Sequence, residues 1–244
     1  MTTWVLLRGL MRESRHWGDF PHLFQDAVGA SAVVTLDFPG NGSLHAQTSA
    51  STVEAMANCV REQLKQRGYP PPYSVLALSL GAMVAVAWSS LYPDEIEKLV
   101  LINTSLAPYS PFYHRLRPAN YADLMLLLIA ASAVRREKLI LHLTSRQRHP
   151  GILKQWVAYA QEYPVARVNI LRQLLAASRY RALPPPVPVL LLASNQDRLV
   201  NVRCSLALAE HWQCPVRLHP DAGHDLPLDD PVWVAQQVRE WLVA

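Results

Sequence analysis

The chain of 244 residues contains only three cysteines, and they lack the patterns that give cysteine a structural or metal-binding role. Cys59, Cys204 and Cys214 are odd in number and include no C-x-x-C pair, so neither a disulfide framework nor a thiolate metal site is indicated. We interpret them as small buried apolar residues. Histidines outside the motifs discussed below follow no ligand spacing. We therefore expect neither a metal ion nor a cofactor.

Long hydrophobic runs are also missing. The longest, residues 124–131, stops at Ser132 and is followed by Arg135-Arg136, whereas about 20 apolar residues are needed to cross a bilayer. Strand-like sequence at residues 4–7 comes directly after Met1-Thr2-Thr3, without the basic segment or the small-residue cleavage site of a secretory signal. We therefore expect a cytoplasmic protein with no membrane span.

Short apolar runs that alternate with helical patterns define the fold class. Half of the residues are apolar, which is enough for one large core. Most of the runs are too continuously apolar to have a solvent face, as is typical of parallel strands covered on both sides. Helix signals lie between them, such as the capping box at 51–54, the stop at Gly68, and the N-cap Asp230 followed by Pro231. The alternation predicts an α/β fold with a doubly wound, mostly parallel sheet. The expected strands cover residues 4–7, 32–36, 73–78, 99–102, 187–193 and 216–218.

Residues 108–181 interrupt this alternation, because they offer only helical patterns between two good strands. We interpret them as a helical cap inserted over the sheet, between the core segments 1–107 and 182–244. A proline-rich run at 184–188, which favours an extended and stiff backbone, returns the chain to the core. The helical patterns cover residues 124–134, 137–144, 152–163 and 167–180.

The most informative stretch is Ala77-Leu78-Ser79-Leu80-Gly81, which follows an apolar strand and precedes an Ala-rich helix. This is the pattern of a nucleophile elbow, a strained strand-to-helix turn that holds its central side chain clear of the sheet. Small residues two positions to either side of Ser79 allow the strand and the helix to pack closely. The alternative to a catalytic role is a structural one, in which Ser79 is simply a small residue that fits a tight turn.

A serine hydroxyl is a poor nucleophile unless a base takes its proton, so an elbow predicts a histidine and an orienting carboxylate further along the chain. Asp197 follows the strand expected at 187–193, and His224 follows the last expected strand. We expect Gly223 to give the loop the freedom to bring His224 towards Ser79.

Other roles and other residues remain open at these two positions. Instead of orienting a histidine, Asp197 could cap a loop or form a surface ion pair. Asp221, only three residues before His224, is a rival candidate for the orienting acid. His211 lies in a helical pattern and His219 at the edge of a strand, so structural roles suit them better than that of a base.

Taken together, these residues resemble capped, single-domain serine esterases of the α/β-hydrolase superfamily, and the resemblance extends from Trp4 to Leu242. The segment Asp37-Phe38-Pro39-Gly40-Asn41-Gly42-Ser43 is similar to the family's D-x-P-G-x-G-x-S turn. Arg8-Gly9-Leu10 stands where many members have His-Gly followed by an apolar residue. The resemblance implies two sets of site residues. They are a catalytic triad of Ser79, Asp197 and His224, and an oxyanion hole formed by the backbone amides of Leu10 and Leu80.

Two positions depart from the family pattern. Ala77 replaces the first glycine of the elbow, which still permits close packing. Arg8 replaces histidine, and a guanidinium at the mouth of the site is always charged, so it is a possible substrate-binding group for an acidic substrate. The structural alternative for Arg8 is to bond loop carbonyls and hold the oxyanion turn.

The resemblance implies hydrolysis of a carboxylic ester of a small or acyl-chain substrate through an acyl-enzyme. Thioester hydrolysis and carbon-carbon bond hydrolysis use the same triad and remain open. A non-catalytic ligand-binding protein on this fold is a further alternative, which the complete triad argues against. Dehalogenases and epoxide hydrolases of this fold place aspartate at the elbow, so Ser79 argues against them.

The charge of the chain is concentrated in the expected cap. Twelve basic and three acidic residues give residues 108–181 a charge of +9, whereas the whole chain carries +4. One interpretation is a solvated helical surface, and the other is a docking face for an acidic partner such as an acyl carrier. Leu, Ile and Met on the other faces would line an acyl pocket. Nucleic acid is not indicated, because the arginines are not interleaved with stacking aromatics in a recognised module.

Overall fold

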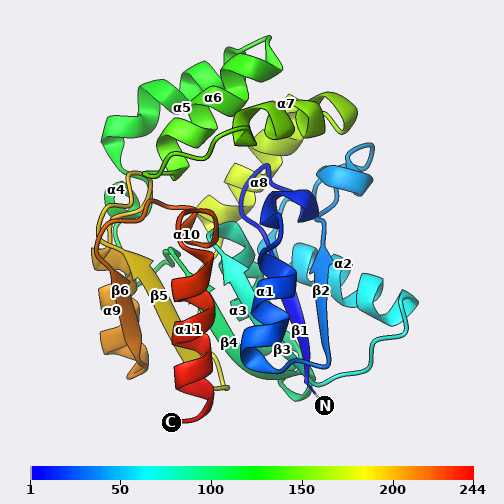
Figure 1. Ribbon diagram of the computed structural model, residues 1–244, viewed down its shortest axis with the longest axis vertical. Coiled ribbons are helices and arrows are strands. Elements are labelled where there is room, and N and C mark those ends of the chain that lie inside the picture. The colour runs from blue at the N-terminus through cyan, green and yellow to red at the C-terminus, as the bar shows by residue number, and fades with distance from the viewer. Residues whose placement is uncertain (1) are drawn as a thin grey trace.

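A parallel six-stranded sheet lies at the centre of the computed structural model, which describes residues 2–244 (Figure 1). The strand order is β2-β1-β3-β4-β5-β6, and all neighbouring strands run parallel. The expected fold class is confirmed, and each expected strand lies within three residues of an observed one at either end. The strands are β1 (Thr3–Leu7), β2 (Ala32–Leu36), β3 (Tyr73–Leu78), β4 (Ile96–Ile102), β5 (Val189–Ser194) and β6 (Val216–His219).

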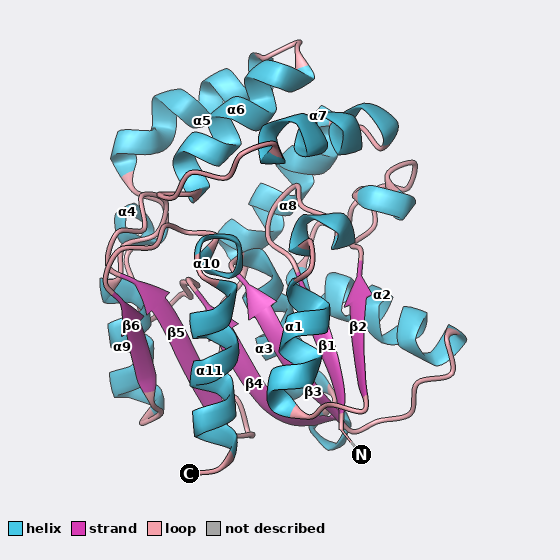
Figure 2. Ribbon diagram, in the orientation of Figure 1, coloured by secondary structure: helices cyan, strands magenta, loops and turns pink. Residues whose placement is uncertain are grey.

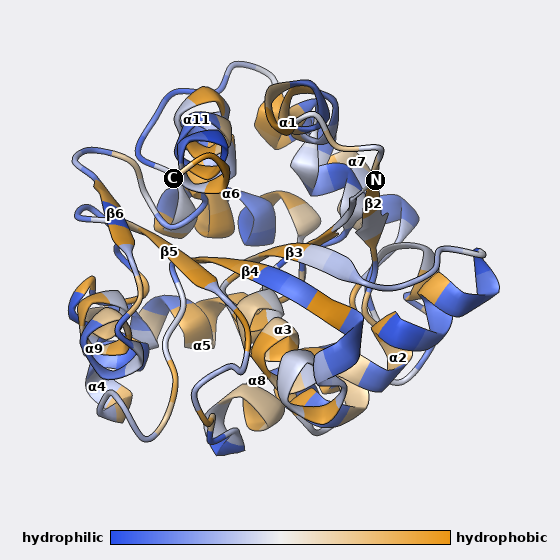
Figure 3. Cartoon of the chain, turned by 90° about the horizontal axis from the view of Figure 1, so that it is seen from below, coloured by the Kyte–Doolittle hydropathy of each residue, from blue (hydrophilic) through white to orange (hydrophobic). Residues whose placement is uncertain are grey.

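Helices cover both faces of the sheet. The strand order places β2 on one side of β1 and β3 to β6 on the other side. Because every crossover between parallel strands keeps the same hand, this change of direction puts helices on both faces. Figure 3 looks along the sheet and shows the two helical layers with their apolar residues turned towards it. One layer contains α1 (Phe20–Val28) and α11 (Pro231–Leu242). The other contains α2 (Val53–Gln66), α3 (Leu80–Leu91) and α9 (Arg203–Trp212).

The strand residues alternate between two apolar cores. In β1, Trp4 and Leu6 pack on the α1 and α11 side, whereas Val5 and Leu7 pack on the α2 and α3 side. This follows from the two-residue period of a strand, in which successive side chains point to opposite faces. All residues of β3 and β5 are buried. The largely apolar sequence of these strands therefore reflects a sheet that is covered on both sides.

The helix ends agree with the local sequence signals in part. Asp230 caps α11 by accepting a hydrogen bond from the Trp233 amide at 2.9 Å. In α2 the cap is Thr52, whose hydroxyl oxygen accepts from the Ala55 amide, so the helix begins one residue later than the capping box predicts. Short 3₁₀ turns lie at Ser14–Trp17, Gly42–Leu44, Pro93–Glu95 and Pro118–Asn120.

The helices of residues 108–181, which we call the cap segment, lie beyond the carboxyl ends of the strands (Figure 2). The segment leaves and rejoins the rest of the chain at adjacent points, because Ala107 and Arg181 form a parallel bridge. One expectation is wrong: the helix expected at 124–134 is interrupted at residues 130–132, where extended backbone separates two helices. The cap helices are α4 (Phe112–Arg115), α5 (Tyr121–Ile129), α6 (Ala133–Thr144), α7 (Ile152–Glu162) and α8 (Arg167–Arg179).

The remaining helix, α10 (Leu226–Asp229), follows β6 and precedes α11. Among residues 2–244, no helix combines the length and the apolar character that a membrane crossing requires.

Candidate active site

Ser79 stands at the turn between β3 and α3 in a backbone conformation that side chains rarely adopt. Its φ is 55° and its ψ is −114°, which is strained for a residue other than glycine. Gly81 allows this turn, because a Cβ atom at that position would lie 2.6 Å from the carbonyl oxygens of both Leu7 and Arg8. Ala77 is fully buried, so its methyl group is accommodated in the core.

The loop after β1 lies directly beside Ser79. A Cβ atom added at Gly9 would be 3.2 Å from the Ser79 Cβ and 3.8 Å from its hydroxyl oxygen. Leu10 follows in this loop and Leu80 is the first residue of α3, and both residues line the same cavity as Ser79. The two segments expected to supply backbone donors therefore flank the serine.

Asp197 and His224 are hydrogen-bonded to each other and buried. The imidazole Nδ1 lies 2.7 Å from one carboxylate oxygen of Asp197. The other oxygen accepts from the amides of Leu199 at 2.7 Å and Val200 at 3.0 Å. Each oxygen of Asp197 thus has a hydrogen-bond partner, which fixes the orientation of the carboxylate and the plane of the imidazole.

The other candidates from the sequence have different partners. Asp221 is exposed, and its amide donates to the Nδ1 of His219, so it does not take the place of Asp197 beside His224. His219 also lies 3.2 Å from an Asp230 carboxylate oxygen. The His211 Nδ1 lies 2.7 Å from the Ala207 carbonyl oxygen within α9.

Burial and the neighbouring charges act on the pKa of His224 in opposite directions. Burial works to lower the pKa, because it penalises the charged imidazolium. The negative charge of Asp197 and its hydrogen bond work to raise it, and Asp225 adds to them. The net result is a pKa of His224 above the ordinary value for histidine.

Asn103 anchors the His224 loop, and the sequence reasoning did not identify it. Its side-chain amide nitrogen donates to the His224 carbonyl oxygen at 2.8 Å, and its oxygen accepts from the Ser194 amide at 2.8 Å. Asn103 directly follows β4 and Ser194 ends β5, so one side chain joins the ends of two strands to the loop. A polar residue directly after an apolar strand was the signal available in the sequence.

Gly223 has a different role from the expected one. A Cβ atom there would lie 2.6 Å from the Thr144 carbonyl oxygen and 3.1 Å from the Arg146 amide nitrogen. Its own amide donates to the buried carboxylate of Asp229 at 2.7 Å. Glycine is therefore needed for the close approach of the His224 loop to the end of α6, and these contacts hold the loop in place.

Arg8 forms a buried ion pair with Asp225, a contact that neither interpretation of Arg8 anticipated. Two guanidinium nitrogens donate to the two carboxylate oxygens, and the guanidinium lies over the Trp17 ring at 4.7 Å from its centroid. Both charged side chains are nearly inaccessible to solvent, at 2% and 3%. Arg8 precedes the Gly9 turn and Asp225 follows His224, so the pair connects the loops on either side of Ser79.

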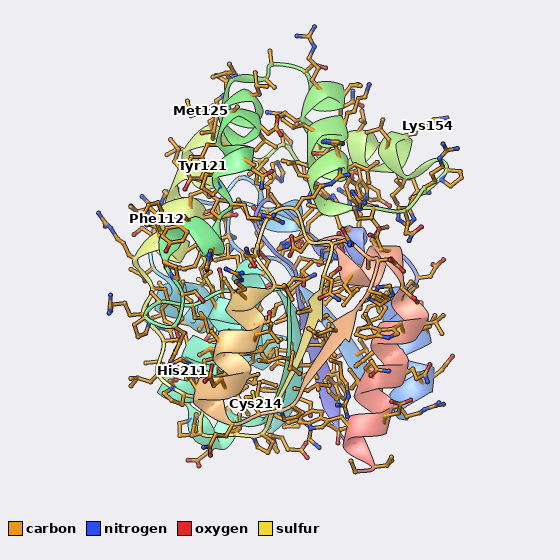
Figure 4. The ribbon with its side chains drawn as sticks, turned by 90° about the vertical axis from the view of Figure 1, so that its left-hand side faces the viewer. Phe112, Tyr121, Met125, Lys154, His211 and Cys214 are labelled. Atoms are coloured by element: carbon orange, nitrogen blue, oxygen red, sulfur yellow. The ribbon has the colours of Figure 1, made fainter. Side chains whose placement is uncertain are left out.

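Ser79 and His224 both line a cavity of about 400 Å³ between the sheet and the cap segment. Its walls are mostly apolar. Three lining residues, Phe112, Tyr121 and Ser178, are also exposed to solvent, which places the opening among α4, α5 and the end of α8. Figure 4 shows Phe112 and Tyr121 on the same side of the cap segment and Lys154 on the opposite side. The apolar lining includes Leu124, Leu127, Ile140, Leu143, Leu174 and Val200.

The comparison with protein families agrees with this architecture. The family model described as the alpha/beta hydrolase family matches residues 4–237, so the chain belongs to that family. A thermophilic esterase from Thermogutta terrifontis has a similar structure, with a TM-score of 0.79 at 21% identity. The similarity covers 100% of this chain and 90% of that one. At this level of identity the likeness shows the fold.

Two curated relatives match the chain over parts of their length. The biotin biosynthesis bifunctional protein BioHC of Teredinibacter turnerae is 24% identical over 261 residues, which are 98% of this chain and 44% of that protein. The pimeloyl-[acyl-carrier protein] methyl ester esterase of Chromobacterium violaceum is 29% identical over 90 residues, which are 37% of this chain and 33% of that protein. The chain thus spans less than half the length of either relative.

Proposed function

We propose that this protein is a serine hydrolase that cleaves a carboxylic ester through an acyl-enzyme on Ser79. The observation that carries the proposal is the buried hydrogen bond between Asp197 and His224 in the wall of the cavity that Ser79 also lines. A strained serine, an oriented imidazole and a mostly apolar cavity together suit acyl transfer to a hydroxyl group.

The proposed reaction has two halves. His224 takes the hydroxyl proton as the Ser79 oxygen attacks the acyl carbonyl, and it then gives that proton to the departing alcohol. Water attacks the acyl-enzyme in the second half, with His224 again as the base, and the carboxylic acid is released. Asp197 holds the imidazole proton on Nδ1, so that Nε2 is the basic nitrogen. The amides of Leu10 and Leu80 stabilise the negative oxygen of each tetrahedral intermediate.

The pH dependence of hydrolysis tests the role of His224. The base must be neutral, and the pKa of His224 lies above the ordinary value of about 6.5. We therefore expect kcat/KM for an uncharged ester to fall as pH decreases, with the midpoint of this acidic limb above pH ~6.5. The pH profile of kcat/KM measures that midpoint. A limb centred below the ordinary histidine value would argue against His224 in this environment as the base.

An ester or thioester bound to an acyl carrier is a second candidate substrate. The cap segment is strongly basic, and its exposed cations include Arg135, Lys138 and Lys154. One relative is named as an esterase acting on an acyl-carrier-bound methyl ester. Complementary charge steers the association of proteins, and the basic helices would supply it for an acidic carrier.

Charge reversal at Arg135 and Lys138 tests docking of a carrier. We expect the double change to glutamate to lower kcat/KM for a carrier-bound ester by about tenfold, with little effect on the same ester free in solution, because surface charge acts mainly on encounter. Reversal of Arg239, an exposed residue of α11 on the core, serves as the matched control. Equal effects on carrier-bound and free esters would exclude docking through these two residues.

A further inference from the structure

Three arginines line the cavity, and they differ in how their charge is compensated. Arg8 is paired with Asp225, and Arg12 donates to Glu137 through two nitrogens at 2.8 Å each. Arg115 takes part in none of the ion pairs formed within residues 2–244. One wall of the cavity therefore carries a cation without an anion.

The surroundings of the Arg115 guanidinium are neutral. One terminal nitrogen donates to the Ala177 carbonyl oxygen in α8 at 2.7 Å, and the Nε atom is buried without a partner. Burial lowers the pKa of Arg115, and Cys204, the one neighbour that acts to raise it, is a thiol whose own pKa is raised by burial. An unpaired guanidinium in such a place is costly unless another group completes its hydrogen bonds.

Arg115 lies within reach of a bound substrate. Both Arg115 and its partner Ala177 line the cavity, so the contact between them lies in its wall. The Arg115 carbonyl oxygen accepts from Ser105, and the adjacent Thr104 donates to the Ser79 carbonyl oxygen at 3.1 Å. The helix that carries Arg115 is therefore connected to the elbow through two neighbouring residues of one loop.

We propose that Arg115 binds a carboxylate at the non-reacting end of the substrate, so that the preferred esters are monoesters of dicarboxylic acids. The inference rests on the proposed ester hydrolysis. The planar guanidinium keeps N–H groups on its two terminal nitrogens, and their spacing matches the two oxygens of a carboxylate. The apolar walls would hold the methylene chain between that carboxylate and the ester.

A binding experiment on the Ser79→Ala protein tests the inference without turnover. Two ligands of equal chain length are titrated by calorimetry: monomethyl adipate, which carries a carboxylate, and methyl hexanoate, which does not. We expect the first to bind about tenfold more tightly or better, because a charged hydrogen bond is lost in the second. Adding Arg115→Gln should remove the difference, and Arg115→Lys should keep part of it. Equal affinities in the Ser79→Ala protein would overturn the inference.

A matched control separates local binding from the general charge of the cap segment. Arg179 is exposed at the end of α8 and does not line the cavity, so Arg179→Gln should keep the preference for monomethyl adipate. Loss of the preference in this control to the same extent as in Arg115→Gln would overturn the assignment to Arg115. Thermal unfolding of each variant shows whether it is folded, and the lysine variant carries the test if the glutamine variant is not.

Hydrolysis by the parent protein distinguishes the failure of this inference from the failure of the proposed function. Arg115-dependent binding of monomethyl adipate, together with no hydrolysis of either ester, would support the carboxylate site and contradict the hydrolase. Hydrolysis of both esters with equal KM values, unchanged by Arg115→Gln, would support the hydrolase and overturn the carboxylate site.

Discussion

Replacing Ser79 with alanine should lower the hydrolysis of an activated ester by about 10⁴- to 10⁶-fold, because the acyl-enzyme can no longer form. The change removes one oxygen atom from a residue that is partly exposed in the cavity, and alanine bears the same backbone strain as serine at φ 55°. We therefore expect the variant to keep the stability of the parent in thermal unfolding. The measurement is kcat/KM for a chromogenic ester at a pH above the acidic limb.

The double variant with His224→Ala makes this prediction more specific. Residues that act as a unit show effects that do not add, so removing both should cost little more than removing Ser79 alone. Losses that multiply would show that the two side chains act separately. A Ser79→Ala protein as active as the parent would contradict the proposed mechanism altogether.

The second large effect is expected at the buried pair of Arg8 and Asp225. Changing Arg8 to methionine leaves the Asp225 carboxylate buried without a cation, which typically costs about 3–5 kcal/mol. The free energy of unfolding, measured in urea, should fall by about that amount. An Arg8→Met protein within about 1 kcal/mol of the parent would show that the carboxylate finds water or another donor.

A double variant in which Asp225 is also replaced, by leucine, separates the charge from the packing. Two apolar side chains leave no unpaired charge, so this variant should recover most of the lost stability. We expect its kcat to remain below that of the parent, because the pair connects the turn that carries Leu10 to the loop that carries His224. A double variant with the kcat of the parent would show that the ion pair does not position these loops.

The parts of the fold that could be predicted are those encoded in neighbouring residues. The β3 strand is apolar apart from Ser74 and is followed by Ser79, which has small residues two positions to either side, so the burial of the strand and the turn after it are both local properties. The loop of Asp197 could be placed because it follows the apolar strand β5, and the loop of His224 because it follows the last strand, β6. Parallel strands bring their carboxyl ends to one edge of the sheet, which makes convergence of the three segments a consequence of topology.

The contacts that were missed join residues that are far apart in the sequence. Arg8 and Asp225 are separated by 217 positions, and no local pattern pairs them. Asn103 contacts the His224 loop from the end of β4. Position 223 requires glycine because Thr144, at the end of α6, lies too close for a side chain. The break at residues 130–132 was missed because two of its three residues are alanines, which have the highest helix propensity. Such details follow from tertiary packing, which a single sequence does not reveal.

Activation of Ser79 by His224 is the central claim, and reaction with a fluorophosphonate probe followed by peptide mapping tests it most directly. The parent protein should form a single adduct on Ser79, and the His224→Ala protein should label far more slowly under the same conditions. An adduct on another residue, or labelling of Ser79 at the parent rate without His224, would contradict the claim.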